Sequence, residues 1–260
     1  MSADRKLANA RGLYMEGIRD GNAREALDQY TGDRYTQHST GVADGKEGFL
    51  AFFLPFLERN PVRDITIARA LVDGDGVFVH VFQSLNGGEA KWVTADFFDT
   101  DAQDKIVEHW DTIQAFVQPT VSGRSMIDGS STIGDLERTE SNRALVSSYL
   151  QDVLVARAYH RMGEFIAADQ YHEHSPKVPD GLAGVTDYFA NAASPSVHYI
   201  TIHKLLVQGN FAASLSEVRI EGVDHAVIDI FRMAGGQIVE HWDVAEAIAP
   251  RDTWNNSGKF

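Results

Sequence analysis

Apolar side chains follow two different periods along the chain. Over residues 7–27 and 145–158 they recur every three to four positions, which is the spacing of an amphipathic helix. Shorter apolar runs over residues 48–54 and 185–190 predict one further helix after each of these regions. The pattern therefore predicts that each half of the chain begins with helices.

After each helical region the pattern changes to alternation. Residues 77–83, 91–99 and 106–112 are rich in β-branched and aromatic side chains and predict strands. The Asn-Gly-Gly sequence at 86–88 is a strong hairpin signal between the first two of them. Helices followed by a meander of antiparallel strands indicate the α+β class. We expect each sheet to curve around its helices as a cone with an internal cavity.

The two halves of the chain carry the same motifs in the same order. Residues 107–111 and 239–243 both read Val-Glu-His-Trp-Asp, at an offset of 132 (239 − 107). Tyr35 and Tyr171 each begin a Tyr-x-x-His motif, at an offset of 136 (171 − 35). Loss of a few residues from hairpin loops of the second copy explains why the offset falls from 136 to 132, because loops tolerate changes of length. An ordered series of matches predicts a tandem duplication.

A polar segment separates the two copies. Residues 122–138 are rich in glycine, serine and threonine, which is typical of a linker. The predicted organisation is a first domain over residues 1–121 and a second over residues 139–260. Two such cones can pack sheet to sheet as an intrachain pseudo-dimer that imitates a twofold homodimer, and further self-association stays open.

Composition excludes several classes of function. The chain of 260 residues has no cysteine, which excludes disulfides, thiolate metal sites and a cysteine nucleophile and fits a reducing, cytoplasmic compartment. Lys and Arg number 23 against 37 Asp and Glu, a formal net charge of −14 that disfavours nucleic acid as a partner. The chain also lacks an apolar run long enough for a membrane span, so no membrane partner is expected.

Taken together, these motifs resemble the SnoaL-like family of the nuclear transport factor 2-like superfamily, which is named after a polyketide cyclase. In the first copy the resemblance rests on Tyr35-x-Gln37-His38, Asp44-Gly45, Gly74-Asp75-x-Val77-Phe78-Val79-His80 and Glu108-His109-Trp110-Asp111-x-x-Gln114. In the second copy it rests on Tyr171-x-x-His174, Asp180-Gly181, Asp229-Ile230-Phe231-Arg232 and Gly236-x-Ile238-Val239-Glu240-His241-Trp242-Asp243.

The resemblance implies a pocket lined by the concave face of the sheet. Better-studied members need neither a metal nor an organic cofactor, so none is expected here. They use an aspartate and one or more histidines to move protons next to a carbonyl group, as in cyclisation, isomerisation or dehydration. A small apolar molecule in one or both pockets is therefore the expected partner. Because the superfamily also contains non-enzymes, a ligand-binding or scaffold protein is the alternative.

Asp96 is the candidate carboxylate for this chemistry, with Asp229 as its counterpart in the second copy. Removing a proton beside a carbonyl requires a base close to that carbon and a donor for the enolate oxygen. If the hairpin register turns both side chains inward, His80 shares the pocket with Asp96 as the donor or second base. The alternative is that Asp96 and His80 form a satisfied structural pair in the sheet.

Further candidates for ligand contact surround these residues. Alternation along the Glu-His-Trp-Asp strand separates Glu and Trp from His and Asp, so one pair faces the pocket and the other an interface. A structural role is the alternative for each of them. The pocket candidates are Tyr35, His38, His109 and Trp110 in the first copy, and Tyr171, His174, His241 and Trp242 in the second.

The copies differ at positions that matter for the chemistry. The first copy has His80 where the offset places Ser214, and Gln37 where the second has Glu173. One active and one degenerate site is therefore a reasonable outcome of the duplication. Three histidines can hold zinc, but the family pattern already accounts for the histidines in question, so no metal site is predicted.

Overall fold

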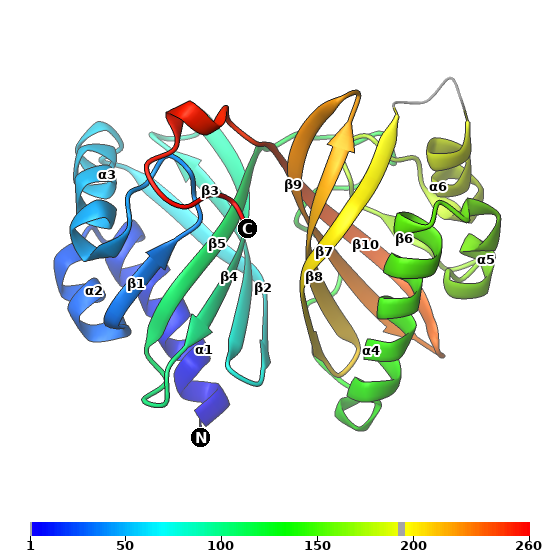
Figure 1. Cartoon of the computed structure of the whole chain (residues 1–260), viewed down its shortest axis with the longest axis horizontal. Helices are drawn as coiled ribbons and strands as arrows, with labels where there is room; N and C mark the ends of the chain where they lie inside the picture. The colour runs from blue at the N-terminus through cyan, green and yellow to red at the C-terminus, as the bar shows by residue number, and fades with distance from the viewer. Residues whose placement is uncertain (1, 192–195) are drawn as a thin grey trace. The chain divides into compact units, whose positions relative to one another are not determined.

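The chain forms two compact units in a computed structural model, which describes residues 2–191 and 196–260 (Figure 1). Unit 1 consists of Met1–Ala115 together with Ile248–Phe260, and unit 2 consists of Phe116–Ala247. Each unit holds one copy of the predicted repeat, in which one strand precedes the last α-helix and the other four strands follow it. The predicted α+β class and the tandem arrangement are both confirmed.

Unit 1 opens with helices whose apolar faces pack against one side of its sheet. They are α1 (Ser2–Gly12), a π-helical segment (Leu13–Arg19), α2 (Ala23–Tyr30) and α3 (Gly45–Arg59). Leu13, Leu27 and Phe49 from these helices form one buried cluster with Val79 and Phe98 of the sheet. The predicted period therefore places the core between the helices and one face of the strands.

The sheet of unit 1 has five strands in the order β1-β5-β4-β3-β2. They are β1 (Thr31–Gln37), β2 (Arg63–Asp73), β3 (Gly76–Leu85), β4 (Ala90–Thr100) and β5 (Ile106–Ala115). The last four form an antiparallel meander, in which β3, β4 and β5 were predicted and β2 was not. β1 pairs with β5 in parallel, so the expectation of a purely antiparallel sheet is corrected to a mixed one.

Unit 2 repeats this plan. Its helices are α4 (Thr139–Ser148), a π-helical segment (Tyr149–Val155), α5 (Met162–Phe165) and α6 (Gly181–Ala190). Its strands are β6 (His172–Glu173), β7 (Val197–Gln208), β8 (Phe211–Ile220), β9 (Val223–Ala234) and β10 (Gln237–Ala247), in the sheet order β6-β10-β9-β8-β7. Here too the first strand pairs in parallel with the last.

The hairpin between β3 and β4 forms at the predicted turn. The loop consists of residues 86–89, between the paired residues Leu85 and Ala90, and Asn86 and Gly87 both have positive φ, 51° and 72°. This turn sets the register in which Val79 lies opposite Asp96. Turn chemistry therefore determines which side chains of β3 share a face with the candidate carboxylate.

The segments that follow the last strand of each copy extend the units in an unexpected way. Ile248–Phe260, here called the C-terminal strap, belongs to unit 1 rather than to the second copy from which it continues. Residues 116–135, here called the linker strap, belong to unit 2, where Ser122 Oγ donates to the carbonyl of Glu173 at 2.6 Å. The compact units thus differ from the contiguous division expected from the sequence, because each strap packs on the other copy.

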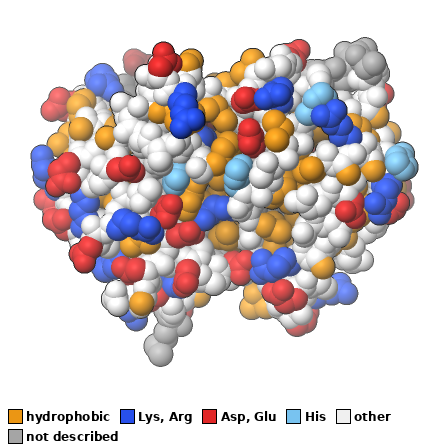
Figure 2. Space-filling view, in the orientation of Figure 1, with side chains coloured by type: hydrophobic (Ala, Val, Ile, Leu, Met, Phe, Trp, Pro, Cys, Tyr) orange, Lys and Arg blue, Asp and Glu red, His pale blue; other side chains and the backbone are white. Residues whose placement is uncertain are grey.

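Acidic and basic side chains are interspersed over both units on the face drawn in Figure 2, so the net charge of −14 is distributed rather than gathered there. Within the described part of the chain, no helix combines the length and the apolar character that crossing a bilayer requires.

Candidate active site

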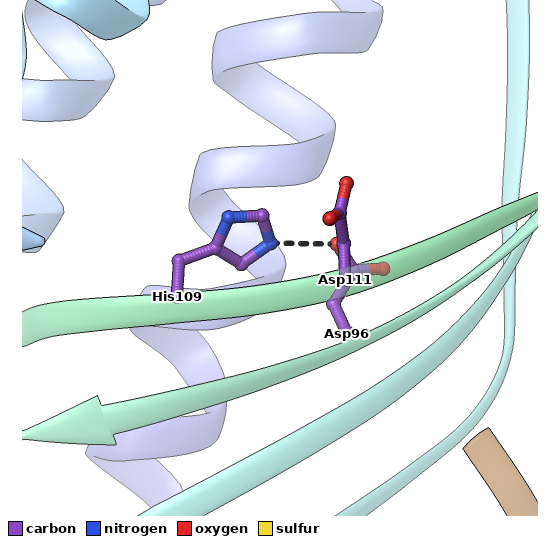
Figure 3. A group of neighbouring side chains, drawn as sticks. All are labelled: Asp96, His109 and Asp111. Carbon is purple, nitrogen blue, oxygen red and sulfur yellow. Dashed lines mark hydrogen bonds and ion pairs between the residues drawn. The ribbon is translucent and has the colours of Figure 1, made fainter. Parts of the chain in front are cut away.

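Asp96 lies in the middle of β4, on the face of the sheet that the helices cover. It is 2% exposed, and it pairs across the strands with Val79 on one side and Asp111 of β5 on the other. His109 lies two residues before Asp111 on the same face of β5. The strand register therefore brings two carboxyl groups and one imidazole together (Figure 3).

Hydrogen bonds link these groups into one network. His109 Nε2 lies 2.9 Å from Asp96 Oδ1, and Tyr14 Oη donates to Asp96 Oδ2 at 2.7 Å. His109 Nδ1 donates to Gln37 Oε1 at 2.9 Å, an atom that also accepts from the backbone N–H of Ser39. Because Nδ1 carries a proton, the contact between Nε2 and Asp96 shares one further proton between imidazole and carboxyl.

The two carboxyl groups have pKa values displaced in opposite directions. Burial raises the pKa of Asp96, and hydrogen bonds from His109 and Tyr14 offset this only in part. Burial also disfavours the Asp111 carboxylate, but the Lys259 ammonium and His109 outweigh it and lower the pKa of Asp111. Lys259 Nζ lies 3.0 Å from Asp111 Oδ1 and its side chain is 2% exposed. Two carboxyl groups with such different pKa values can have different roles: Asp96 suits proton exchange, and Asp111 suits a permanent negative charge.

A cavity of about 150 Å³ opens beside the network. Asp96, His109 and Asp111 form part of its polar end. Tyr35 also lines the cavity, and its hydroxyl makes no hydrogen bond to any residue that the structure describes. Most of the remaining wall is apolar and consists of Leu13, Ile18, Val42, Phe49, Phe52, Phe53, Phe56, Phe98 and Ile113.

Unit 2 has the same arrangement with different partners. His241 lies between Asp229 Oδ1, at 3.2 Å, and Glu173 Oε1, at 2.8 Å. Burial alone would lower the pKa of His241, but the two carboxylates outweigh it and hold that pKa well above its ordinary value. Asp243 lies opposite Asp229, as Asp111 lies opposite Asp96. The cavity here is only about 50 Å³.

The structure does not form the predicted pair of Asp96 with His80. Asp96 pairs with Val79, and His80 pairs with Ala95, so His80 points to the opposite face of the sheet. There its Nδ1 lies 3.1 Å from Arg69 Nη1. The assumed register was wrong by one residue, and one residue exchanges the two faces of a strand.

The register also corrects the equivalence of His80 and Ser214 that the sequence offset indicated. Asp96 and Asp229 are equivalent, and Asp229 pairs with Ser214. Ser214 therefore corresponds to Val79 of unit 1, and the position of His80 is occupied by Leu215.

Four of the eight predicted pocket residues line a cavity, namely Tyr35 and His109 in unit 1 and Tyr171 and His241 in unit 2. Their contact with a ligand stays a prediction. The other four, His38, Trp110, His174 and Trp242, are absent from both cavity walls.

These four residues face the straps instead. His38 stacks on Trp110 with ring centroids 4.6 Å apart, and its Nδ1 donates to the carbonyl of Gly258 in the C-terminal strap at 2.7 Å. His174 stacks on Trp242 in the same way and donates to the carbonyl of Ser125 in the linker strap at 2.7 Å. Each Glu-His-Trp-Asp strand thus directs His and Asp to the cavity and Trp to the strap side.

Sequence reasoning missed three residues of the two networks. Tyr14 gave no signal, because a tyrosine in an apolar period is expected in the core. Tyr199 lies on β7 and donates to Asp229 Oδ1 at 2.9 Å. Its role was missed because the tyrosine that bonds the equivalent Asp96, Tyr14, comes from a helix and not from a strand. Lys259 lies in a tail whose packing partner the sequence does not indicate.

Among the described residues, one group of three side chains could hold a metal ion: Asp96, His109 and Asp111. Carboxylate and imidazole are common ligands of divalent cations. Lys259 already places a positive charge beside Asp111, and His109 Nε2 is bonded to Asp96. Lys259 therefore occupies Asp111, and a shared proton occupies Asp96 and His109. Both would compete with a metal cation for these ligand atoms.

Comparison with known protein families shows which family the chain belongs to. The SnoaL-like domain matches residues 12–109 and again residues 146–241, which together span most of the chain. The chain therefore belongs to the SnoaL-like domain family and carries the domain twice. Comparison with curated proteins gave no match.

Three solved structures that are similar to this chain each match less than half of it. A putative ketosteroid isomerase from Kribbella flavida has 21% identity and a TM-score of 0.38, with 44% of this chain and 84% of that chain covered. A putative polyketide cyclase from Bacillus cereus has 20% identity and a TM-score of 0.38, with 42% and 74% covered. A putative SnoaL-like polyketide cyclase from a Jannaschia species has 19% identity and a TM-score of 0.37, with 43% and 87% covered.

Proposed function

We propose that unit 1 is a cofactor-independent enzyme that moves a proton at the carbon next to the carbonyl group of a small or medium apolar compound. The observation that carries the proposal is Asp96, a buried carboxyl group at the polar end of an apolar cavity and bonded to His109. Aldol-type cyclisation, isomerisation and dehydration all include this proton transfer. Membership of the SnoaL-like family supports the class of chemistry and leaves the reaction open.

Asp96 serves as the base in this proposal. Removing a carboxylate from water makes it a stronger base, which is the direction in which burial displaces the pKa of Asp96. His109 shares the proton of Asp96 and is held by Gln37, so the imidazole can take up or return that proton without leaving its place. Asp111 keeps its charge beside Lys259 and does not compete for the proton.

Tyr35 serves as the donor to the developing enolate oxygen. Tyr35 lines the cavity, and its hydroxyl is buried and has no hydrogen-bond partner among the described residues. Burial, together with the charges of Asp96 and Asp111, raises the pKa of Tyr35 far above its ordinary value, so the phenol keeps its proton at neutral pH. A buried donor without a partner is costly unless a ligand accepts from it.

The cavity sets the size of the substrate. A dry cavity of about 150 Å³ accommodates a benzene ring in another protein. The cavity of unit 1 has the same volume, and its wall includes Phe49, Phe53 and Phe56. We therefore expect a substrate with at least one ring-sized apolar portion and a carbonyl group directed at Tyr35.

Exchange of protons for solvent deuterium tests the proposal without knowledge of the complete reaction. Cyclic ketones and enones are incubated with the protein in D₂O, and loss of the hydrogens next to the carbonyl is followed by NMR. The intact protein is expected to accelerate the exchange, and Asp96→Asn to slow it by about 100-fold or more, since general bases contribute on that scale. Thermal stabilisation by a ketone without any exchange would instead indicate a non-catalytic binding module.

A further inference from the structure

The cavity of unit 1 reaches the surface between α3 and β5. Among the described residues of unit 1, three large apolar side chains are exposed, namely Phe52, Val62 and Ile113. Phe52 of α3 and Ile113 of β5 line the cavity, whereas Val62 does not. Single exposed apolar residues are common on protein surfaces, but two that line one cavity from two different elements mark its mouth.

Exposure rises along β5 toward this mouth. His109, Asp111 and Ile113 occupy alternate positions of the strand and share one face. His109 is 8% exposed, Asp111 is half-buried, and Ile113 is 38% exposed. Alternate residues of a strand lie about 7 Å apart along it. The mouth therefore lies one such step beyond Asp111, and little more than a six-membered ring separates it from the polar end.

Aromatic rings form the wall on the side of α3. Phe49 packs edge-on against Tyr35, with ring centroids 5.9 Å apart, and stacks on Phe53 at 4.1 Å. Phe52 packs edge-on against Phe53 at 5.1 Å. Phe49 is 2% exposed and Phe52 is 43% exposed. The rings thus lead from Tyr35, the proposed donor, to the surface.

The exposed part of the cavity wall is apolar. Among the described residues that line the cavity, Phe52 and Ile113 alone are exposed, and every polar one is buried or half-buried. Apolar surface in contact with water is unfavourable, and an apolar group of a ligand that covers it removes this cost. A polar or charged group at the mouth would gain nothing from these two side chains.

We propose that the substrate of unit 1 is a ring ketone that carries an apolar chain on the side of the ring away from the carbonyl, and that Phe52 and Ile113 select for this chain. With the carbonyl at Tyr35, the far side of the ring faces the mouth, so the chain leaves between α3 and β5. The inference rests on the function proposed for unit 1, because that function places the carbonyl beside Tyr35 and Asp96.

A series of cyclohexanones tests the inference. The carbon opposite the carbonyl carries hydrogen, methyl, propyl or pentyl; dissociation constants are measured by NMR titration, and exchange next to the carbonyl is followed in D₂O. Full burial of a methylene group strengthens binding about fourfold. At a mouth that stays partly exposed we expect about twofold per carbon, hence about eightfold from hydrogen to propyl. Pentyl should add little, since its last carbons extend into water.

Variants at the mouth locate the chain. The double variant Phe52→Gln and Ile113→Thr removes the apolar mouth and keeps residues that suit a helix and a strand. We expect it to bind the hydrogen and propyl compounds within about twofold of each other. Val62→Thr is the matched control, because Val62 is an exposed apolar residue of unit 1 outside the cavity wall, and it should keep the full ratio.

The outcomes separate this inference from the proposed function. Equal affinity for all four ketones, or an undiminished ratio in the double variant, would overturn the inference even where exchange is fast. Absence of exchange, with an affinity that rises with chain length and depends on Phe52 and Ile113, would reject the proposed reaction and support recognition of the chain. No binding of any ketone would overturn both. If circular dichroism shows that the double variant is unfolded, the two single variants replace it, and each should reduce the ratio.

Discussion

Single residues decide how the two networks are charged. The imidazole of His109 donates to the neutral amide of Gln37, whereas that of His241 lies between the carboxylates of Glu173 and Asp229. Burial lowers the pKa of His241 and the two carboxylates raise it more strongly, so unit 2 holds an imidazolium ion. One substitution between amide and carboxylate therefore separates a proton-sharing network from a permanently charged one.

Replacing Glu173 by Gln tests this difference. The variant removes one negative charge 2.8 Å from His241 Nδ1 and keeps the hydrogen bond. We expect the pKa of His241 to fall, because an opposite charge at this distance is lost. NMR titration of the imidazole resonances measures the change. An unchanged pKa of His241 would contradict this explanation of the difference between the two networks.

Burial and the charges of Glu173 and Asp229 raise the pKa of Asp243 to about 7, although His241 and a hydrogen bond from Ser175 act in the opposite direction. This displaced pKa has a consequence for stability. Its value of about 7 in the folded state exceeds the ordinary value of about 3.9, so the stability that its protonated form contributes is complete below about pH 4 and is lost as pH rises through about 7. At about 1.4 kcal/mol per pKa unit, the loss is at most about 4 kcal/mol.

Asp243→Asn should remove this pH dependence, because the amide does not ionise. We expect the variant to gain stability relative to the intact protein between about pH 5 and about pH 8, measured by urea denaturation at both values. Equal pH dependence in the two proteins would contradict the assignment.

Among the elements, the last strand of each sheet directs alternate side chains to the cavity and to a strap. His109 and Asp111 of β5 line the cavity, while Trp110 stacks on His38 at the C-terminal strap. Alternation predicts this separation from the sequence. It does not predict the register between β3 and β4, on which His80 was misplaced, because either register buries apolar residues such as Phe78 and Val79.

The C-terminal strap delivers Lys259 to Asp111. The folded state lowers the pKa of Asp111, so the stability from this pair is present above about pH 3.9 and is lost as pH falls through the lower folded pKa. Lys259→Met removes the ammonium group and leaves a buried carboxylate unpaired. We expect a loss of about 3–5 kcal/mol at pH 7 and a smaller loss near pH 3.

Chemical denaturation at the two pH values measures this effect. The exposed Lys91→Met is the control and should change little. A variant at Lys259 that is as stable as the intact protein at pH 7 would show that the strap does not neutralise Asp111.

For the whole molecule, the duplication could be predicted because its motifs keep their order and nearly constant offset. The exchange of straps could not be predicted, for a physical reason. Both copies offer a strap the same receptor, a histidine stacked on a tryptophan, as His38 on Trp110 and His174 on Trp242. Local sequence therefore cannot indicate which copy a strap chooses.

Truncation after Ala247 tests the exchange. It removes the C-terminal strap, which follows the second copy in sequence but belongs to unit 1. Hydrogen exchange read by mass spectrometry should show faster exchange in β5 of unit 1 and little change in β10 of unit 2. Loss of protection confined to β10 would mean that the strap stabilises the copy that carries it.

We propose that proton transfer takes place in the cavity of unit 1 and depends on Asp96. The most direct test compares Asp96→Asn with the equivalent Asp229→Asn in the exchange of ketone hydrogens for deuterium. We expect Asp96→Asn to lose about 100-fold or more of the accelerated exchange and Asp229→Asn to keep most of it. Full exchange in folded Asp96→Asn, or an equal loss in both variants, would contradict it.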